Sequence, residues 1–318
     1  MSRFAHAFGP EHPEATYVPH AFPEQTFDAG EVELNYAFAG SDEKPALLLV
    51  PGQSESWWGY EQAMPLLAEY FQAFAIDLRG QGRSTRTPGR YTLDNMGNDL
   101  VRFIDGVICR RTIVSGLSSG GVLSAWLSAY AIPGQVRGAH YEDPPLFCSE
   151  VDTSCGQSIR QGAGPMFALW SKYLGDQWSV GDWDAMAVAA PHEVPAWMAA
   201  LFSPMAGGEP PQNLKEYDPE WARAFWTGSV AASCDHARML SSVKVPVLLT
   251  HHFRRVEEKT GFLMGALSDL QAARARELIS AAGQRVDYRS FPAMGHSMHG
   301  QDPRLFTDTL VDWAATLP

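Results

Sequence analysis

Short apolar runs alternate with amphipathic stretches along most of the chain. Runs that predict strands occupy residues 31–38, 46–50, 72–76, 112–115, 136–141, 245–250 and 286–291. Patterns with helical spacing occupy residues 58–71, 92–104, 120–131, 270–281 and 305–316. Strands that alternate with helices predict an α/β fold, with a mostly parallel central sheet flanked by helices on both faces.

The alternation stops for residues 144–243 and then resumes. We interpret this insertion as a helical cap over the carboxyl ends of the strands, where open α/β sheets bind their ligands. The predicted organisation is therefore a core formed by residues 1–143, with an irregular arm at 1–24, a cap at 144–243, and the rest of the core at 244–318.

The cap is rich in large apolar side chains. Six of the ten tryptophans fall within it, namely Trp170, Trp178, Trp183, Trp197, Trp221 and Trp226. Most of these rings should pack the cap against the core, but a small cap cannot bury so much aromatic area internally. We therefore expect some of them to line a pocket for a bulky, largely apolar substrate.

Composition excludes several classes of function. The 318 residues are 45% hydrophobic and 19% charged, as is typical of a globular protein, and the net charge of −12 disfavours nucleic acids and anionic membranes as partners. No stretch of 18 apolar residues occurs, and residues 1–21 lack the pattern of a secretory signal. The four cysteines form neither a CxxC pair nor a zinc-ligand spacing, which indicates reduced thiols. We expect a cytoplasmic protein without cofactor or metal, and the arm at 1–24 weakly favours a homo-oligomer.

A candidate nucleophile lies between a predicted strand and a predicted helix. The segment Gly116-Leu117-Ser118-Ser119-Gly120 matches the G-x-S-x-G pattern of a nucleophile elbow. Glycines two residues before and after Ser118 remove side chains that would collide in so tight a turn. Ser119 is the rival nucleophile, but only Ser118 has a glycine at both of these positions. The pattern predicts Ser118 as the nucleophile.

The base and the acid of a catalytic triad should follow other strands. His296 lies in the loop between the last predicted strand and the final helix, where it can act as base, and His299 is expected to be a solvated side chain. The strand before the cap ends in Glu142-Asp143. We favour Glu142 as the acid, because its longer side chain suits the reach to His296, and Asp143 is the alternative.

Two backbone N–H groups should stabilise the oxyanion that forms during acyl transfer. The residue after the nucleophile, Ser119, is expected to supply one. The other is expected from Gln53, in the loop Pro51-Gly52-Gln53 that follows a buried strand.

The segment that begins Asp77-Leu78-Arg79-Gly80 is interpreted as a hydrogen-bonded glycine turn without a catalytic role.

In combination these motifs resemble the α/β-hydrolase superfamily over nearly the whole chain outside residues 1–24. More narrowly, the chain resembles bacterial zearalenone hydrolases, which are lactonases, in the glutamate after the strand before the cap, the tryptophan-rich cap and the segment Leu248-Leu249-Thr250-His251-His252-Phe253. This resemblance implies a triad of Ser118, Glu142 and His296, and opening of the macrocyclic lactone of zearalenone to a hydroxy acid that then loses carbon dioxide.

The function expected from the sequence is therefore hydrolysis of an ester or lactone of a bulky aromatic small molecule. Three alternatives remain. The same triad serves carbon–carbon hydrolases of aromatic ring-fission products, whose anionic substrates Arg254 and Arg255 could bind. An aryl esterase is a further alternative, and a non-catalytic small-molecule receptor is the third.

Overall fold

The computed structural model describes residues 17–147, 158–175, 181–202 and 211–318. An eight-stranded sheet in the order β1-β2-β4-β3-β5-β6-β7-β10 forms its centre. The β1–β2 and β2–β4 pairs are antiparallel, and the remaining pairs are parallel. The strands are β1 (Glu24–Asp28), β2 (Glu33–Ala39), β3 (Ala46–Val50), β4 (Gln72–Ile76), β5 (Thr112–Leu117), β6 (Val136–Glu142), β7 (Val247–His251) and β10 (Val286–Ser290). A separate hairpin contains β8 (Arg255–Val256) and β9 (Leu263–Met264).

The helices fall into a core set and a cap set. The core set is η2 (Trp57–Tyr60), α1 (Met64–Leu67), α2 (Leu93–Phe103), η3 (Ile104–Ile108), α3 (Ser119–Tyr130), α9 (His236–Leu240), α10 (Asp269–Ala281), α11 (Met298–Gln301) and α12 (Pro303–Ala314). The cap set is α4 (Ile159–Tyr173), α5 (Trp183–Glu193), α6 (Ala196–Phe202), α7 (Gln212–Lys215), α8 (Pro219–Thr227) and η5 (Ser229–Ala231). Helix α9 also lies between β6 and β7, within the cap predicted at 144–243, but it packs against α3 and α10 of the core.

The central strands are buried because helices cover both faces of the sheet. All five residues of β3 are buried, which explains why this strand is a continuous apolar run. Leu48 and Val50 belong to an apolar cluster that includes residues of α2, α3 and α10, whereas Leu47 and Leu49 belong to the cluster on the other face, which includes residues of α1 and α12. The α/β fold with a mostly parallel sheet is thus confirmed.

Two local expectations differ from the structure. The helix predicted at residues 58–71 is wrong, because the segment forms two short pieces, η2 and α1. Pro65 explains the break, since proline lacks the N–H of a continuing helix and is favoured in a first turn, where α1 places it. Residues 1–16 of the arm predicted at 1–24 lie outside the described residues. At the other end of this arm, Glu24 is already the first residue of β1, which pairs with β2.

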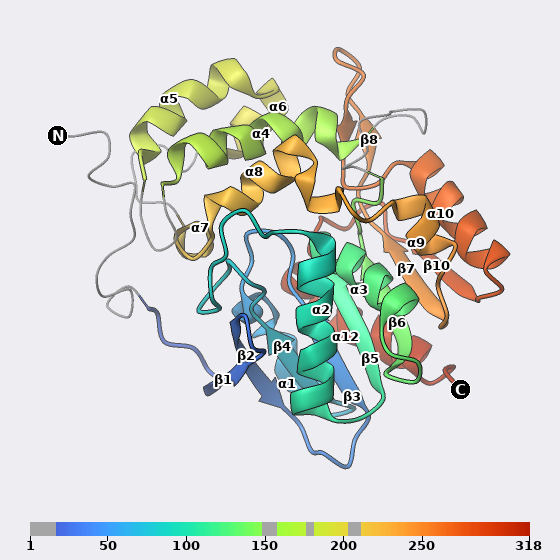
Figure 1. The fold of residues 1–318 in the computed structure, drawn as a ribbon. Helices are drawn as coiled ribbons and strands as arrows, with labels where there is room; N and C mark the ends of the chain where they lie inside the picture. Colours follow the sequence, from blue (N-terminus) through green and yellow to red (C-terminus); the bar gives the residue numbers. More distant parts are fainter. Residues whose placement is uncertain (1–16, 148–157, 176–180, 203–210) are drawn as a thin grey trace.

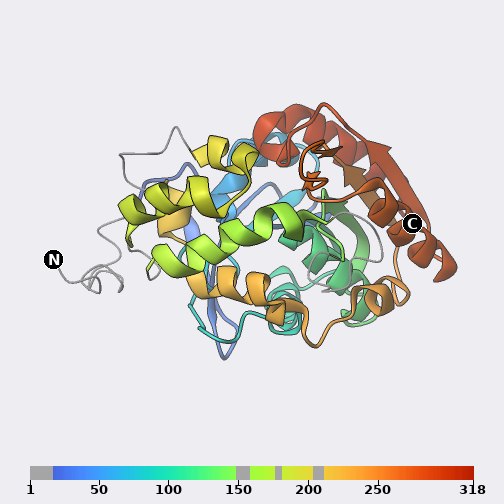
Figure 2. The ribbon, with the colours of Figure 1, turned by 90° about the horizontal axis from the view of Figure 1, so that it is seen from above.

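The cap helices lie over the carboxyl ends of the strands (Figures 1 and 2). The segment that enters α8 is held to the core by buried polar contacts. Glu216 accepts hydrogen bonds from the Ser56 hydroxyl at 2.5 Å and from the indole of Trp58 at 2.9 Å. Asp218 accepts a hydrogen bond from the hydroxyl of Tyr91. The chain boundaries of the cap, 144 and 243, remain a prediction.

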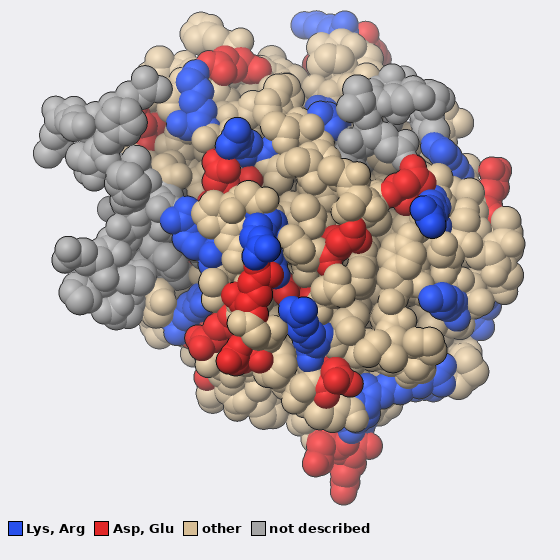
Figure 3. Space-filling model, viewed as in Figure 1, with Lys and Arg blue, Asp and Glu red and all other residues tan. Residues whose placement is uncertain are grey.

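Charged side chains of both signs are interspersed among uncharged ones on the face seen in Figure 3. No helix within the described residues is both long and apolar enough to cross a bilayer.

The glycine turn after β4 is hydrogen-bonded as expected. Asp77 accepts the backbone N–H groups of Trp57 and Arg83. The guanidinium of Arg79 donates to both carboxylate oxygens of Asp99, at 2.6 and 2.8 Å.

Candidate active site

Ser118 occupies a strained turn between β5 and α3. Its φ of 55° and ψ of −120° lie in a region that side chains rarely adopt. A side chain at Gly116 would overlap the carbonyl of Gly120, and one at Gly120 would overlap the carbonyl of Val50. The two glycines therefore let the strand and the helix approach closely, as the sequence pattern predicts.

His296 lies in the loop between β10 and α11, and its Nδ1 is 2.7 Å from Oδ2 of Asp143. The Asp143 carboxylate is buried, and its Oδ1 also accepts the backbone N–H of His252 at 3.1 Å. A hydrogen bond from Nδ1 to a carboxylate leaves Nε2 as the nitrogen that can take a proton. Asp143 and His296 thus form an oriented acid–base pair.

The prediction that Glu142 is the partner of His296 is wrong. Glu142 is buried and instead contacts His299: its Oε2 is 3.0 Å from Nδ1 of His299, and its Oε1 accepts the backbone N–H groups of Met298 and His299. The physical reason is that consecutive residues at the end of β6 point in different directions, and Asp143 takes a positive φ of 42°. His299, expected to be solvated, is also buried, at 1% exposure.

These pairings change the pKa values of His296, Glu142 and His299. The side chain of His296 is 44% exposed. Partial desolvation would lower its pKa, but the hydrogen bond and charge of Asp143, together with the charges of Glu55 and Glu142, raise the pKa above its ordinary value. Burial alone would raise the pKa of Glu142, but the charge and hydrogen bond of His299 lower it to about 2. The pKa of His299 is likewise raised by Glu142 and Glu55 against the effect of burial.

Ser118, His296 and Asp143 line one cavity of about 610 Å³ between core and cap. This volume is in the range of small-molecule sites. The cap contributes a largely apolar wall that includes Met166, Phe167, Trp170, Trp197 and Met198. Ser118 and His296 form no hydrogen bond with each other within the described residues, and such bonds in free enzymes often form only when substrate binds.

The cap tryptophans therefore have different environments. Trp170 and Trp197 line the cavity, as expected for some of them. Trp183 and Trp221 are buried, and Trp226 is 41% exposed, so these rings serve packing or lie at the surface. Trp178 lies outside the described residues.

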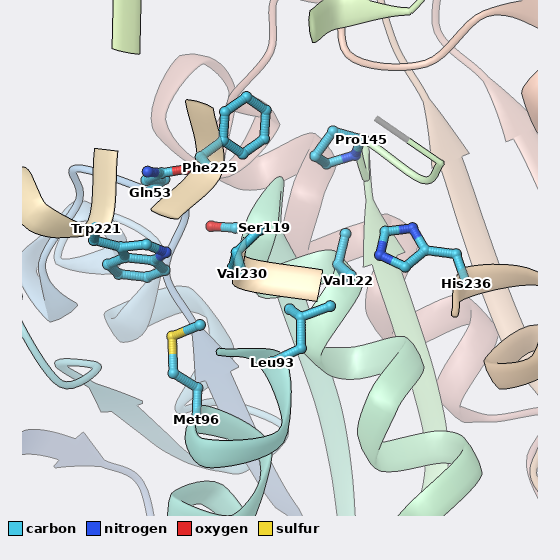
Figure 4. A pocket seen from close by; sticks show the side chains of 10 residues that line it. All are labelled: Gln53, Leu93, Met96, Ser119, Val122, Pro145, Trp221, Phe225, Val230 and His236. Atoms are coloured by element: carbon cyan, nitrogen blue, oxygen red, sulfur yellow. The ribbon is translucent and has the colours of Figure 1, made fainter. Parts of the chain in front are cut away.

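Ser119 faces a different space. Its side chain lines a small cavity of about 20 Å³ together with Trp221, Met96 and Val230 (Figure 4). The Oγ of Ser119 is buried and has no hydrogen-bond partner among the described residues. The two neighbouring serines thus present their hydroxyls to different cavities, and that of Ser118 lies in the larger one.

The loop after β3 lies beside the nucleophile, as the expected oxyanion site requires. Gln53 lines both cavities, and its side-chain amide donates to the hydroxyl of Tyr217 in the cap at 2.5 Å. Ser119 is the first residue of α3, where backbone N–H groups lack partners in the helix. The use of the Gln53 and Ser119 amides as oxyanion donors remains a prediction.

The site differs in one further way from what the sequence suggested. Glu55, which sequence reasoning did not single out, also lines the large cavity. The position of Glu55 two residues after Gln53, the expected oxyanion residue, is the sequence feature that could have identified it as part of the site. Within the described residues, no group of three His, Cys, Asp or Glu side chains is arranged to hold a metal ion.

Comparison with known proteins gives consistent matches. A profile described as the Alpha/beta hydrolase family matches residues 47–309. The chain is 28% identical over 105 residues to 3-oxoadipate enol-lactonase 2 of Acinetobacter baylyi, a segment that is 33% of this chain and 39% of that protein. It is 31% identical over 139 residues to bifunctional epoxide hydrolase 2 of Sus scrofa, a segment that is 43% of this chain and 24% of that protein. Each match spans less than half of the relative's own length.

Solved structures share the fold over nearly the whole chain. The crystal structure of E-2-(acetamidomethylene)succinate hydrolase is similar with a TM-score of 0.65 and 19% identity, over 93% of this chain and 100% of that one. The enol-lactonase of Burkholderia xenovorans is similar with a TM-score of 0.62 and 17% identity, over 92% of this chain and 100% of that one. At these identities the likeness concerns the fold.

Proposed function

Because the chain belongs to the alpha/beta hydrolase family, we propose that it is a serine hydrolase that cleaves an ester or lactone bond of a bulky aromatic molecule. Zearalenone, a macrocyclic lactone, is the specific candidate substrate. The observation that carries the proposal is the convergence of Ser118, in its strained turn, and the Asp143–His296 pair on one cavity.

The proposed reaction proceeds through an acyl-enzyme. Ser118 Oγ attacks the carbonyl carbon while Nε2 of His296 takes its proton, and Asp143 stabilises the resulting imidazolium. The amides of Gln53 and Ser119 hold the oxyanion. His296 then gives the proton to the departing alkoxide, and a water molecule deprotonated by His296 releases the acid and restores Ser118.

The lining of the cavity supports the proposed substrate class. Aromatic and methionine side chains bind ring systems by stacking and dispersion, and the wall formed by Phe167, Trp170 and Trp197 offers such surfaces. The indole N–H groups of Trp170 and Trp197 have no acceptor among the described residues. Both nitrogens are shielded from solvent, so the proposed contacts of these residues with a substrate are made by their ring faces.

The lining of the cavity does not support carbon–carbon hydrolysis of ring-fission products. Those substrates carry carboxylates, but the part of the cavity wall that the structure describes contains no Lys or Arg. Arg254 donates to Asp269 at 2.9 Å and to Ser290, and Arg255 is exposed.

The proposal is tested by covalent labelling and by turnover. A fluorophosphonate probe should label the wild-type protein and the Ser119→Ala variant, and it should not label Ser118→Ala. Incubation with zearalenone, followed by chromatography of the products, should show ring opening that depends on Ser118. A wild-type protein that reacts with no probe and hydrolyses no ester would support a receptor instead.

A further inference from the structure

Glu55 places a carboxylate in the wall of the otherwise largely apolar cavity. Its side chain is 27% exposed and lines the same space as Ser118 and His296. The other carboxylate in this wall, that of Asp143, is occupied by His296 and by the backbone N–H of His252. No Lys or Arg among the described residues forms an ion pair with Glu55. Glu55 is therefore the acidic group in the wall that remains available to a ligand.

One oxygen of Glu55 is held in place from behind. Oε2 accepts the backbone N–H of Gly52 at 3.2 Å and lies 4.0 Å from Nε2 of His299. His299 is itself anchored, because it stacks on Tyr60 with ring centroids 3.9 Å apart and is bonded to Glu142. This support orients the carboxylate.

The other oxygen, Oε1, makes no hydrogen bond within the described part of the chain. Glycine at position 52 also keeps the space between Glu55 and the nucleophile open. A side chain there would lie 3.3 Å from Oε2 of Glu55 and 3.4 Å from Cβ of Ser118. Glu55 thus offers a free acceptor oxygen to a substrate bound at Ser118.

We propose that Glu55 is a specificity-determining residue, which accepts a hydrogen bond from a hydroxyl group of the substrate and excludes substrates that carry a carboxylate at that place. A hydrogen bond to a charged acceptor discriminates strongly against an analogue that lacks the donor. A second carboxylate would instead be repelled by Glu55. This inference rests on the proposed function only for the position of the reacting ester beside Ser118.

Turnover of matched substrates tests the inference. We suggest benzoate esters that carry a hydroxyl, a methoxyl or a carboxylate at one ring position. Because Glu55 also raises the pKa of His296, kcat/KM should be compared on the alkaline plateau, where His296 is neutral in every variant. The wild type should prefer the hydroxyl over the methoxyl ester, and Glu55→Gln should reduce that preference about tenfold and improve turnover of the carboxylate ester.

The control is Glu69→Gln, which removes the same charge at an exposed position outside the cavity wall. It should keep the wild-type ratios. The inference is overturned if the wild type has no preference, or if Glu55→Gln lowers kcat/KM for all three esters by one common factor. Glu55→Met, which keeps the length of the side chain without its charge, repeats the test if Glu55→Gln does not fold.

Binding provides a second arm that needs no turnover. In the Ser118→Ala background, calorimetry with the same esters should show tighter binding of the hydroxyl than of the methoxyl compound, and adding Glu55→Gln should abolish the difference. If the wild type hydrolyses none of the esters, the proposed function fails, yet this ratio still decides the role of Glu55. Equal affinities in the Ser118→Ala protein would refute it.

Discussion

At the scale of single residues, the site contains two histidine–carboxylate pairs, built from neighbouring acids at the end of β6. Asp143 contacts His296, which lies on the cavity, and Glu142 contacts His299, which is buried behind it. The two pairs are therefore expected to differ in what they contribute: the first should control reactivity and its pH dependence, and the second should control stability.

Asp143→Asn should lower kcat/KM by about 10³-fold, because the amide no longer holds the reactive tautomer of His296 or stabilises its charged form. Since Asp143 raises the pKa of His296, the residual activity should also decline at a lower pH than in the wild type as the solution is acidified. A pH profile of kcat/KM with an ester substrate measures both effects. If Glu142→Gln produced this shift and Asp143→Asn did not, the assignment of the two pairs would be reversed.

Glu142→Gln should destabilise the protein by about 3 kcal/mol near neutral pH, because it breaks a buried charged pair. The pKa of Glu142 is lowered from 4.5 to about 2, so its contribution is present above pH 4.5 and is lost as the pH falls toward 2. The pKa of His299 is raised above 6.5, so its contribution is present below 6.5 and is lost as the pH rises through the raised value.

Urea unfolding of wild type and Glu142→Gln should consequently show a larger difference in unfolding free energy at about pH 6 than at about pH 9. Glu69→Gln, a change at an exposed position, serves as the control and should show no comparable trend. A difference that stays constant between the two pH values would contradict the ionised pair.

The choice between Glu142 and Asp143 shows where sequence reasoning ends. That a carboxylate at this strand end serves His296 was correctly predicted, since chain order and the fold place it there. The sequence does not reveal that Asp143 turns to a φ of 42° and thereby directs its shorter side chain at His296. The length of the side chain was the wrong criterion. The direction in which each side chain points at the end of the strand decides whether Glu142 or Asp143 contacts His296.

At the scale of elements, the strand–turn–helix around Ser118 was predictable because its cause is steric and local. The segment at 58–71 was not, because apolar spacing alone does not show that Pro65 starts a new helix there. A local cause was thus predicted correctly where the pattern contains it: the glycine motif contains the turn at Ser118, whereas apolar spacing does not register the proline at position 65.

Gly120→Ala should cost at least about 3 kcal/mol of unfolding free energy and abolish activity, because its Cβ would overlap the carbonyl oxygen of Val50 and force β3 and α3 apart. Gly89→Ala is the control: Gly89 has a positive φ of 78° but open space around it, so only about 1 kcal/mol of backbone strain is expected. Urea midpoints compare the two, and equal losses would show that close approach at the turn is not the cause.

At the scale of the whole molecule, the cavity exists only because the cap is held against the core. Ser118, Asp143 and His296 come from the core, whereas Phe167, Trp170 and other apolar residues of the wall come from the cap. The sequence predicted the cap as an insertion, but the contacts that anchor it, such as Glu216 with Ser56 and Trp58, join residues about 160 positions apart in the chain. No local pattern could have revealed them.

Glu216→Ala should therefore loosen the cap as well as destabilise the protein. It leaves the buried hydroxyl of Ser56 and the indole N–H of Trp58 without this acceptor, at a cost of about 3 kcal/mol. Hydrogen exchange in α4 should accelerate, and KM should rise more than kcat falls, because the cap wall contributes binding surface rather than the reacting groups. Glu193→Ala, which removes only a surface ion pair with Lys172, should change stability by no more than about 0.5 kcal/mol. If Glu216→Ala and Glu193→Ala show the same hydrogen exchange in α4 and the same KM, the contacts of Glu216 do not hold the cap. The wall of the cavity must then be positioned by the apolar contacts of α4 and α8 alone.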